Sequence, residues 1–388
     1  MPRSEMTDTI QIAIDPELRL RDEPRTGHNR WHESVPPAIV VADGETVVLD
    51  TRDGFDGQVT SDLTPGTFDR LSFLPNHPMT GPVYIRGAEA GDVLEVQVVD
   101  IEPDPFDHYG FTVIAPGFGL LHEQFPDPFI AHWNLVGREY AESPQVPGVR
   151  IPFAPFCGIM GVAPDSRFRL EVTRREMELA GRGATVMLPD AREAVPADAV
   201  IGAEGLRTIP PRENGGNLDV KQLTPGSSIF LPVYVKGALF SVGDVHFAQG
   251  DGESCGSAIE MRARVTLRFR VHHGGVAQKH DFAPVFTTTV QPSRPAARQV
   301  GTIGLSVEAG ENHSEDLTVA ARRAVQSLIA YLQRSGYSAE QAYVIASVAA
   351  DLKVSQVVDV PNVSVSAVLD LDIFHDGGAR LLTALAEG

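Results

Sequence analysis

The stretch GDVHFAQGDGESCGSAIE, residues 243–260, joins two segments that have the apolar pattern of β-strands. An apolar run that includes Phe240 and Val242 precedes it, and an alternating run extends from near Ile259 to Val271. The loop between the two runs is rich in carboxylates and glycines, and the glycines allow sharp turns and a close approach of the backbone to a small ligand. This pattern predicts a β-rich body in which a polar loop connects two strands.

The polar residues of this loop are suited to a metal or acid–base site. Asp244 and His246 are two residues apart, so in an extended strand their side chains point to the same face. A carboxylate and an imidazole on one face make up half of a catalytic zinc shell, and the Glu253 carboxylate follows closely. The alternative is a glycine-rich hairpin loop at the surface, because a D-x-H pair is short and common.

Composition and charge indicate a globular protein that acts on a small molecule. The chain has 388 residues, 43% hydrophobic and 21% charged, which is typical of a soluble globular protein. A net charge of −19 argues against binding to nucleic acid or to an anionic membrane. The sequence has no recognisable signal peptide and no long apolar stretch, so we expect a cytoplasmic location.

The period of the apolar pattern changes near residue 314. Before that point most segments alternate, including residues 93–101 and residues 168–174, whereas residues 191–207 are Ala-rich and loop-like. After it the apolar positions have helical spacing up to Gly336, and Ser338 with Gln341 forms a capping box for a second helix. The expected strands that follow are residues 354–358 and 363–371. The sequence thus predicts a mostly β, α+β protein with its helices concentrated at the C-terminal end.

We expect three parts that form one composite unit. Residues 1–165 are β-rich and contain an aromatic insertion, residues 166–310 carry the polar loop, and residues 311–388 are α+β. The insertion spans about residues 104–164, and a long aromatic segment often covers an active site or an oligomer interface. A homo-oligomer is therefore expected.

Four further polar residues lie in turns next to expected strands. His77 precedes a proline, and Asn217 and Asp219 belong to a Gly-Gly-Asn-Leu-Asp turn at a strand start. Asp53 lies in an acid-rich turn that follows a short apolar strand. Each of these side chains could reach a pocket, or could simply bond to the backbone of its own turn.

Five separated motifs in the same order resemble the acetamidase/formamidase family, over about residues 27–372: GHNRWHESVPP, HPMTGPVYIRGAEAGDVLEV, PPRENGGNLDVKQL, GDVHFAQGDGE and ASVAADLKVSQVVD. The run PGFGLLHEQFPDPF is closer to the acetamidase branch. The resemblance implies β-sandwich and β-barrel layers with an α+β portion. It also implies hydrolysis of a primary amide to a carboxylic acid and ammonia, with bound zinc associated with the family and cyclic amides cleaved by some members.

Amide hydrolysis requires a polarised carbonyl, an activated nucleophile and a proton for the departing nitrogen. A divalent metal, by the resemblance zinc, would supply the first two, and a nearby carboxyl group would move the proton. We assign Asp219, Asp244 and His246 as metal ligands and Asp53 as a possible further ligand. Glu253 is the expected proton shuttle. The expected substrate-orienting groups are His77 and Asn217.

Three alternatives remain open at the level of sequence. The nucleophile could be Cys157 or Cys255, although neither has an adjacent His or Lys and their spacing fits no metal or redox motif. The substrate could be formamide, a cyclic amide or a carbamate. The chain could also be a non-enzymatic β-sandwich module that binds calcium or sugar through the polar loop, a class that ammonia release from acetamide would exclude.

Overall fold

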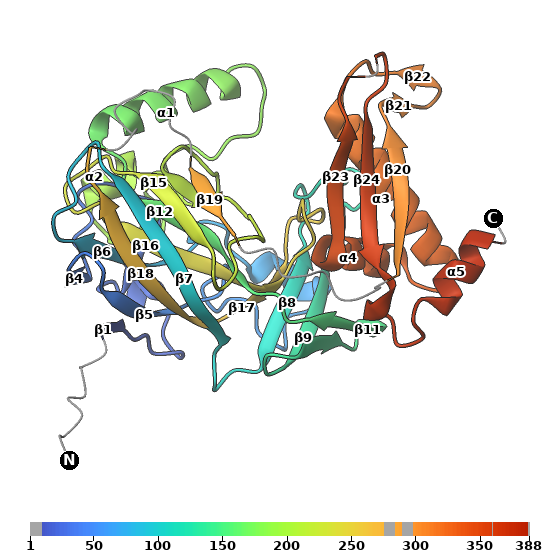
Figure 1. Cartoon of the computed structure of the whole chain (residues 1–388), viewed down its shortest axis with the longest axis horizontal. Helices are drawn as coiled ribbons and strands as arrows, with labels where there is room; N and C mark the ends of the chain where they lie inside the picture. Colours follow the sequence, from blue (N-terminus) through green and yellow to red (C-terminus); the bar gives the residue numbers. More distant parts are fainter. Residues whose placement is uncertain (1–9, 275–283, 289–297, 359, 387–388) are drawn as a thin grey trace.

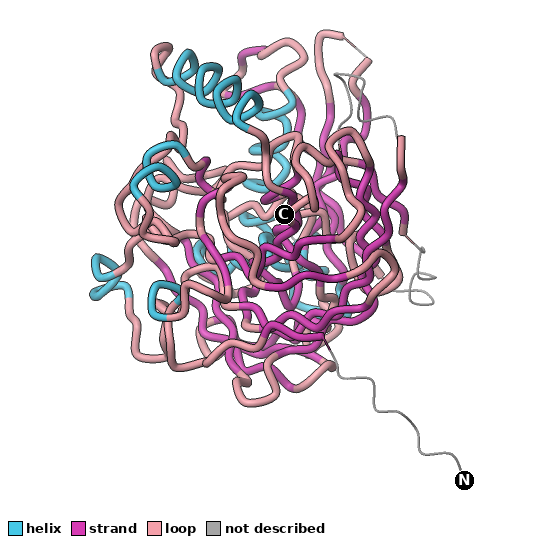
Figure 2. The backbone as a smooth tube through the Cα atoms, turned by 90° about the vertical axis from the view of Figure 1, so that its left-hand side faces the viewer, coloured by secondary structure: helices cyan, strands magenta, loops and turns pink. Residues whose placement is uncertain are grey.

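The computed structural model describes residues 10–274, 284–288, 298–358 and 360–386. Two large sheets form the body of the molecule, and a three-stranded sheet with helices forms the C-terminal part, drawn in orange and red on the right of Figure 1. Strands predominate over helices when the molecule is seen from the side (Figure 2). The mostly β, α+β fold class predicted from the sequence is confirmed, and none of the sheets formed by the described residues closes into a barrel.

The first large sheet has six strands, and its strand β18 (Ala263–His272) shows how the alternating sequence forms it. Val265 and Phe269 are buried whereas Arg270 is exposed, so one face of the strand packs on the core. The strand runs antiparallel to both of its neighbours, with Val265 opposite Leu49 on one side and Ile101 on the other. The spatial order is β1 (Ile10–Ile12), β5 (Thr46–Thr51), β18, β7 (Val93–Pro103), β15 (Ser228–Pro232) and β19 (Val285–Thr287).

The second large sheet has eleven strands, and its centre is buried on both faces. Every residue of β12 and of β16 is buried, which includes the polar Asp244 and His246 of β16. Because burial of a polar group is costly without a partner, these two residues mark the centre of the sheet as a place of function. The main path is β11 (Val146–Pro152), β10 (Tyr140–Ser143), β9 (Phe129–Val136), β8 (Tyr109–Ile114), β17 (Ile259–Met261), β16 (Phe240–Ala248), β12 (Phe156–Val162) and β14 (Gly215–Asn217); β6 (Met79–Ile85) pairs with β16, β2 (Gly27–His28) and β4 (Ile39–Val41).

The C-terminal part is built from a three-stranded sheet and, among the residues that the structure describes, three α-helices. The apolar positions of α3 are buried, and this helix packs on β20 and β24. α4 begins with the Ser338–Gln341 capping box, as expected from the sequence, and contacts β8 and β11 of the body. The elements are β20 (Gln299–Leu305), α3 (Leu317–Arg334), α4 (Ala339–Ala349), β23 (Ala350–Gln356), β24 (Ser364–Asp370) and α5 (Ala379–Ala386).

Several further elements are short ribbons and short helices. One ribbon pairs β3 (Arg30–Trp31) with β13 (Leu206–Arg207), and another pairs β21 (Val307–Glu308) with β22 (Glu311–Asn312). The 3₁₀ helices of the described residues are Leu20–Asp22, Pro65–Arg70 and Leu371–Ile373. Among the helices of the described ranges, none is long and apolar enough to cross a membrane.

Two helices precede residue 314 and correct the prediction for residues 168–174 and part of 191–207. α1 (Ser166–Ala180) covers the first of these segments, and α2 (Ala199–Glu204) lies inside the second. The Asp165 carboxylate accepts a hydrogen bond from the backbone N–H of Phe168 and so caps α1. Val172, four residues after Phe168, is buried on the same side of the helix. The alternation of this short segment therefore concealed an i, i+4 pattern.

The expected parts are interleaved in space. In both large sheets, strands from residues 1–165 lie next to strands from residues 166–310. The C-terminal sheet takes its first strand, β20, from residues before the expected boundary at 311. The boundaries themselves stay a prediction.

The aromatic insertion, residues 104–164, forms strands β8 to β12. Its side chains Phe111, Phe125 and Trp133 are buried within this chain, whereas Phe106 is exposed. Much of its apolar surface therefore serves the core of the protein itself.

Candidate active site

The centre of the candidate site is His246, which lies in the middle of three paired strands. In the strand register it stands opposite Phe156 of β12 on one side and opposite Glu260 of β17 on the other. Its Nε2 atom lies 3.3 Å from Oε2 of Glu260 and 3.5 Å from Oδ2 of Asp244. These three side chains, all buried, form a group whose donor atoms lie within 4.8 Å of one another. We call them the buried triad.

A second group of the same kind shares the imidazole: Asp219, His246 and Glu253. Asp219 follows β14, which pairs with β12. On β12, Gly158 leaves room for this approach, because a Cβ atom there would lie 2.7 Å from Oδ1 of Asp219 and 3.0 Å from Cε1 of His246. Four carboxylates thus converge on one histidine.

Three of these carboxylate residues have backbone conformations in the left-handed region. The φ angles are 49° for Asp219, 52° for Asp244 and 41° for Glu253. Such angles are uncommon for residues other than glycine, and they concentrate at sites where function requires a particular side-chain direction. Asp244 has this left-handed conformation within its strand. The alternation of side chains along an ideal strand therefore does not explain how its carboxylate reaches His246.

Electrostatic coupling in the buried triad favours positive charge at its centre. Burial opposes charge on His246, but the carboxylates of Glu260 and Asp244 raise its pKa well above the usual value. Burial likewise opposes charge on Asp244, but nearby His77 and His246 lower its pKa. The triad therefore requires a proton or a cation between its members.

The other two carboxyl groups are poised to hold a proton. Burial, increased by repulsion from Asp244 and Glu260, raises the pKa of Asp219 to about 7, although His246 acts in the opposite direction. Burial and the neighbouring Asp219 raise the pKa of Glu253 well above its usual value. Two close carboxyl groups do not readily ionise together, so this pair retains a proton near neutral pH.

Several polar atoms of the site lack a hydrogen-bond partner among the described residues. They include both ring nitrogens of His246, Oε2 of Glu260 and Oδ1 of Asp219. The other oxygen of Glu260 accepts hydrogen bonds from Ser257 Oγ (3.1 Å) and from the Ala258 N–H (3.0 Å), which fixes the carboxylate with Oε2 beside His246 Nε2 but without a hydrogen bond. Because buried polar atoms are normally paired, such a cluster of free donor atoms fits a bound divalent cation.

A cavity of about 90 Å³ opens onto these carboxylates. Asp244, Glu253 and Glu260 form part of its lining. The rings of Phe73 and Phe118, also in the lining, stack 5.1 Å apart. Its apolar wall consists of Phe55, Phe73, Val113, Ala115, Phe118 and Ile209. A cavity this small, lined by both carboxylates and apolar side chains, accommodates only a small substrate.

The two residues predicted to orient the substrate, His77 and Asn217, both line this cavity. Nδ1 of His77 and Oδ1 of Asn217 are buried and unpaired among the described residues, so each is available to a ligand. The backbone of His77 is held by Thr208, whose hydroxyl accepts from the His77 N–H and donates to its carbonyl oxygen (2.5 and 2.9 Å).

The structure differs most from the site predicted from the sequence at Asp53 and Glu260. The Asp53 carboxylate accepts hydrogen bonds from the backbone N–H groups of Phe55 and Gly57, so it closes its own turn and belongs to neither carboxylate group. Glu260 was not proposed from the sequence, although it is the one acid among the apolar residues that begin β17. An isolated acid in a buried strand is the signal that could have identified it.

The two cysteines are placed poorly for nucleophilic chemistry. Cys157 and Cys255 are buried, and burial raises the pKa of each to about 12. Cys255 also lies close to the carbonyl oxygens of Val113 and Ser257 (3.8 and 3.6 Å). Neither thiol would be ionised near neutral pH, and the thiolate is the nucleophilic form.

We therefore expect the double variant Cys157→Ser, Cys255→Ser to keep its hydrolytic activity. The smaller hydroxyl fills each buried site less well than the thiol, so the melting temperature should fall while turnover per folded molecule stays close to that of the parent. Ammonia release and thermal unfolding measured on the same preparation check this. A folded but inactive double variant would favour the thiol mechanism.

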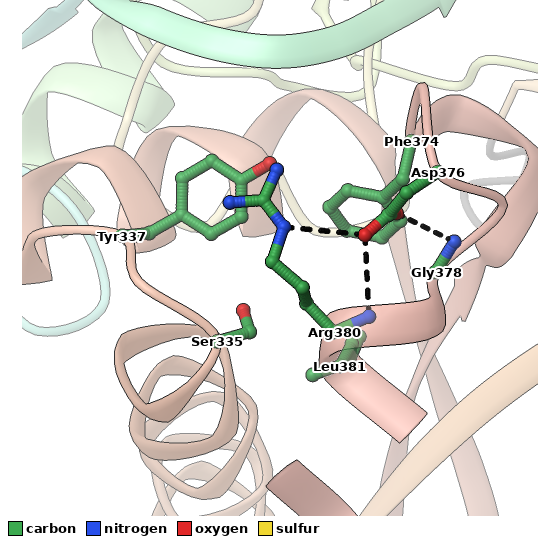
Figure 3. Close-up of a pocket in the computed structure, with 7 residues that line it drawn as sticks. All are labelled: Ser335, Tyr337, Phe374, Asp376, Gly378, Arg380 and Leu381. Atoms are coloured by element: carbon green, nitrogen blue, oxygen red, sulfur yellow. Dashed lines mark hydrogen bonds and ion pairs between the residues drawn. The ribbon is translucent and has the colours of Figure 1, made fainter. Parts of the chain in front are cut away.

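A second hollow, at the C-terminal end, has a structural character (Figure 3). Its volume is about 10 Å³, and its one carboxylate, Asp376, accepts from the Gly378 N–H and from the backbone N–H and Nε of Arg380. Since these donors satisfy the carboxylate and cap the start of α5, we assign no chemistry to this hollow.

The fold and the cavity together define a hydrolytic enzyme with a carboxylate-rich site for a small substrate. The chain belongs to the acetamidase/formamidase family, whose model matches residues 13–376. The family assignment and the amide-hydrolysing class predicted from the sequence are thereby confirmed.

An acetamidase and a formamidase have the same sequence identity to this chain. It is 33% identical over 365 residues to the acetamidase of Mycolicibacterium smegmatis, covering 87% of this chain and 88% of that protein. It is also 33% identical over 383 residues to the formamidase of Methylophilus methylotrophus, covering 94% and 93%. A solved structure, the γ-lactamase from Delftia acidovorans, superposes with a TM-score of 0.88 at 34% identity, covering 94% of this chain and 93% of that chain.

Proposed function

We propose that this enzyme hydrolyses short primary amides to a carboxylate and ammonia, with acetamide preferred to formamide. The observation that carries this proposal is the small cavity, which is lined by three carboxylates and by a set of apolar side chains. The methyl group of acetamide would contact the apolar wall, including Phe73 and Phe118, whereas formamide has no group to place there. A buried methyl or methylene group is worth about 1–3 kcal/mol in such discrimination.

The buried triad of Asp244, His246 and Glu260 is our proposed metal site. Imidazole nitrogen and carboxylate oxygen are both ligands that zinc accepts, and zinc is the metal we propose. When bound, such a metal polarises a carbonyl group and lowers the pKa of water. Asp219, which the sequence suggested as a ligand, is grouped with Glu253 across the imidazole, and we propose that it acts with that residue.

Glu253 is our proposed proton shuttle, with Asp219 as its partner. The proton that this carboxyl pair retains is available to the departing nitrogen, which leaves as ammonia only after protonation. Once Glu253 has given its proton, it is the base that can accept the next one from water. The raised pKa values of both groups suit this exchange near neutral pH.

Orientation of the substrate falls to Asn217 and His77 in this proposal. The free Oδ1 atom of Asn217 can accept a hydrogen bond from the amide N–H₂ group, and a ring nitrogen of His77 can bond to either end of the amide. Both side chains lie in the cavity wall, so they fix the plane of the amide relative to Glu253.

A cyclic amide is the second candidate substrate. The specific observation in its favour is the structural similarity to the γ-lactamase from Delftia acidovorans, with a TM-score of 0.88. A five-membered lactam would have to fit the same cavity of about 90 Å³.

A substrate panel tests the proposal. We expect kcat/KM for acetamide to exceed that for formamide by about tenfold or more, because the apolar wall binds the methyl group. Propionamide, a γ-lactam and a carbamate complete the panel, with ammonia or ring-opened product measured and the metal content determined on the same protein. A clear preference for formamide would reverse the proposed order, and a preference for the lactam would favour the second candidate.

We further propose that the enzyme is a cytoplasmic homo-oligomer. The support is the composition of the chain and the exposed side chain of Phe106 in the insertion. Symmetric homo-oligomers are the most frequent assemblies of soluble enzymes.

A further inference from the structure

The segment that carries Glu253 is supported from behind by one helix of the C-terminal part. We define the acid loop as residues 249–258, between β16 and β17. The described residues make no hydrogen bond to the Glu253 carboxylate, so the backbone of the loop decides where this carboxylate lies. Within the loop, Glu253 bonds through its N–H to the Gly250 carbonyl (3.1 Å), and its carbonyl accepts from the Gly256 N–H (2.8 Å).

Ser347 of α4 connects to the acid loop at three points. Its hydroxyl accepts from the Cys255 N–H (3.1 Å) and donates to the Ser257 carbonyl (2.8 Å). Its own carbonyl accepts from the Gly250 N–H (2.8 Å). The side chain is fully buried, so water does not replace these bonds when they are lost.

Tyr343, one turn earlier on the same face of α4, makes the fourth connection. Its hydroxyl donates to the Ser254 carbonyl and accepts from the Leu121 N–H (2.8 Å), while its ring stacks on Phe125 with 4.4 Å between centroids. Leu121 and Phe125 belong to the aromatic insertion, so the insertion also contacts Tyr343.

The junction of α4 and β23 lies too close to the loop for an independent movement. A Cβ atom on Gly250 would lie 2.0 Å from the Ala350 carbonyl oxygen. The Asp251 N–H donates to the Asp351 carboxylate (3.2 Å), and the Leu352 N–H donates to the Asp251 carbonyl (3.0 Å). The loop is therefore connected on both sides of Glu253 to the C-terminal part.

We infer that Ser347 and Tyr343 are positioning residues of the hydrolytic reaction, which hold Glu253 at the cavity through the backbone of the acid loop. The inference rests on the proposed role of Glu253. The C-terminal α+β part thereby supports the reaction through the acid loop, although neither Ser347 nor Tyr343 lines the cavity. A displacement of a reacting group by about 1 Å can cost about 10²-fold in rate.

The test is a double-mutant cycle with a matched control. Ser347→Ala removes the hydroxyl that bridges Cys255 and Ser257, and Tyr343→Phe keeps the ring and removes only its hydroxyl. Ser335→Ala is the control, because this serine is also buried in the C-terminal part but bonds to the Leu332 carbonyl (2.7 Å) and not to the acid loop. The measurements are kcat, KM, metal content and melting temperature.

We expect Ser347→Ala and Tyr343→Phe to lower kcat by about 10–100-fold with KM within about threefold, and Ser335→Ala to leave kcat unchanged at a comparable loss of melting temperature. In the Glu253→Gln background, Ser347→Ala should lower kcat by no more than about twofold further, because its effect runs through the residue already changed. If Ser347→Ala fails to fold, the kcat of Tyr343→Phe alone tests the inference.

Two outcomes would overturn the inference alone: a kcat of Ser347→Ala and Tyr343→Phe no lower than that of Ser335→Ala, or fully multiplicative losses in the double variant. Full activity of Glu253→Gln would overturn the proposed function of Glu253 and this inference with it. The activity of Glu253→Gln alone therefore distinguishes a failure of the proposed function from a failure of this inference.

Discussion

Replacement of His246 by alanine is expected to abolish both metal binding and measurable amide hydrolysis. His246 is the one residue common to both carboxylate groups, and its imidazole is fully buried between strands β12 and β17. Without it, Asp244 and Glu260 would keep two buried carboxylates but lose the nitrogen that completes the donor set. Loss of one partner of a buried charged pair commonly costs about 3–5 kcal/mol, so the variant should also unfold at a lower temperature.

The matched control for this variant is His28→Ala. His28 is a buried histidine outside both groups, and its Nε2 atom is 2.8 Å from the Ser241 hydroxyl. This control should lose stability but keep the metal and the activity. Metal analysis of the purified proteins together with ammonia release distinguishes the two variants. If His246→Ala retained stoichiometric metal, the buried triad would not be the metal site.

The second large effect is expected for Glu253→Gln, which should keep the metal and lower turnover by about 10²–10⁴-fold. The amide is nearly isosteric with the carboxyl group but cannot take up and release a proton in the same pH range. Since Glu253 is in the cavity lining and contributes no atom to the buried triad, the change should leave metal content intact. The effect should appear in kcat rather than in KM.

Asp251→Asn is the matched control, because it removes a charge from the same loop two residues away. The Asp251 carboxylate lies near Lys221 (3.9 Å) and Gln222 (3.5 Å) and outside the cavity lining. Its turnover should be close to that of the parent. Full activity of Glu253→Gln combined with a large loss in Asp251→Asn would transfer the shuttle role to Asp251, and a variant of Glu253 that lost its metal would reassign Glu253 as a ligand.

The arrangement of the candidate site explains why one polar loop in the sequence was so informative. Asp244, His246 and Glu253 are close in the chain, and all three meet again in space with carboxylates from elsewhere. His77 and Asn217, predicted from separate turns, both reach the cavity. Local signals worked for these residues because polar side chains in loops at strand ends commonly form binding and catalytic sites.

The sequence by itself determined the fold class, the helices of the C-terminal part and the family. Alternation and helical spacing are local properties, so the α3 pattern and the α4 capping box could be predicted without any tertiary contact. The α1 helix was mistaken for a strand because its segment is short and its only fully buried apolar residue is Val172. In such a segment the capping by Asp165 carries the decisive information.

Only the tertiary structure decided which acids join His246. Glu260 is fourteen positions away in the chain and reaches the imidazole because antiparallel register places it opposite on the neighbouring strand. Asp219 arrives through the pairing of β14 with β12 and through the absence of a side chain at Gly158, whereas Asp53 turns back to its own backbone. Register and close approach are set by pairing between distant segments, and a one-residue shift would move each side chain to the other face. No local pattern contains that information.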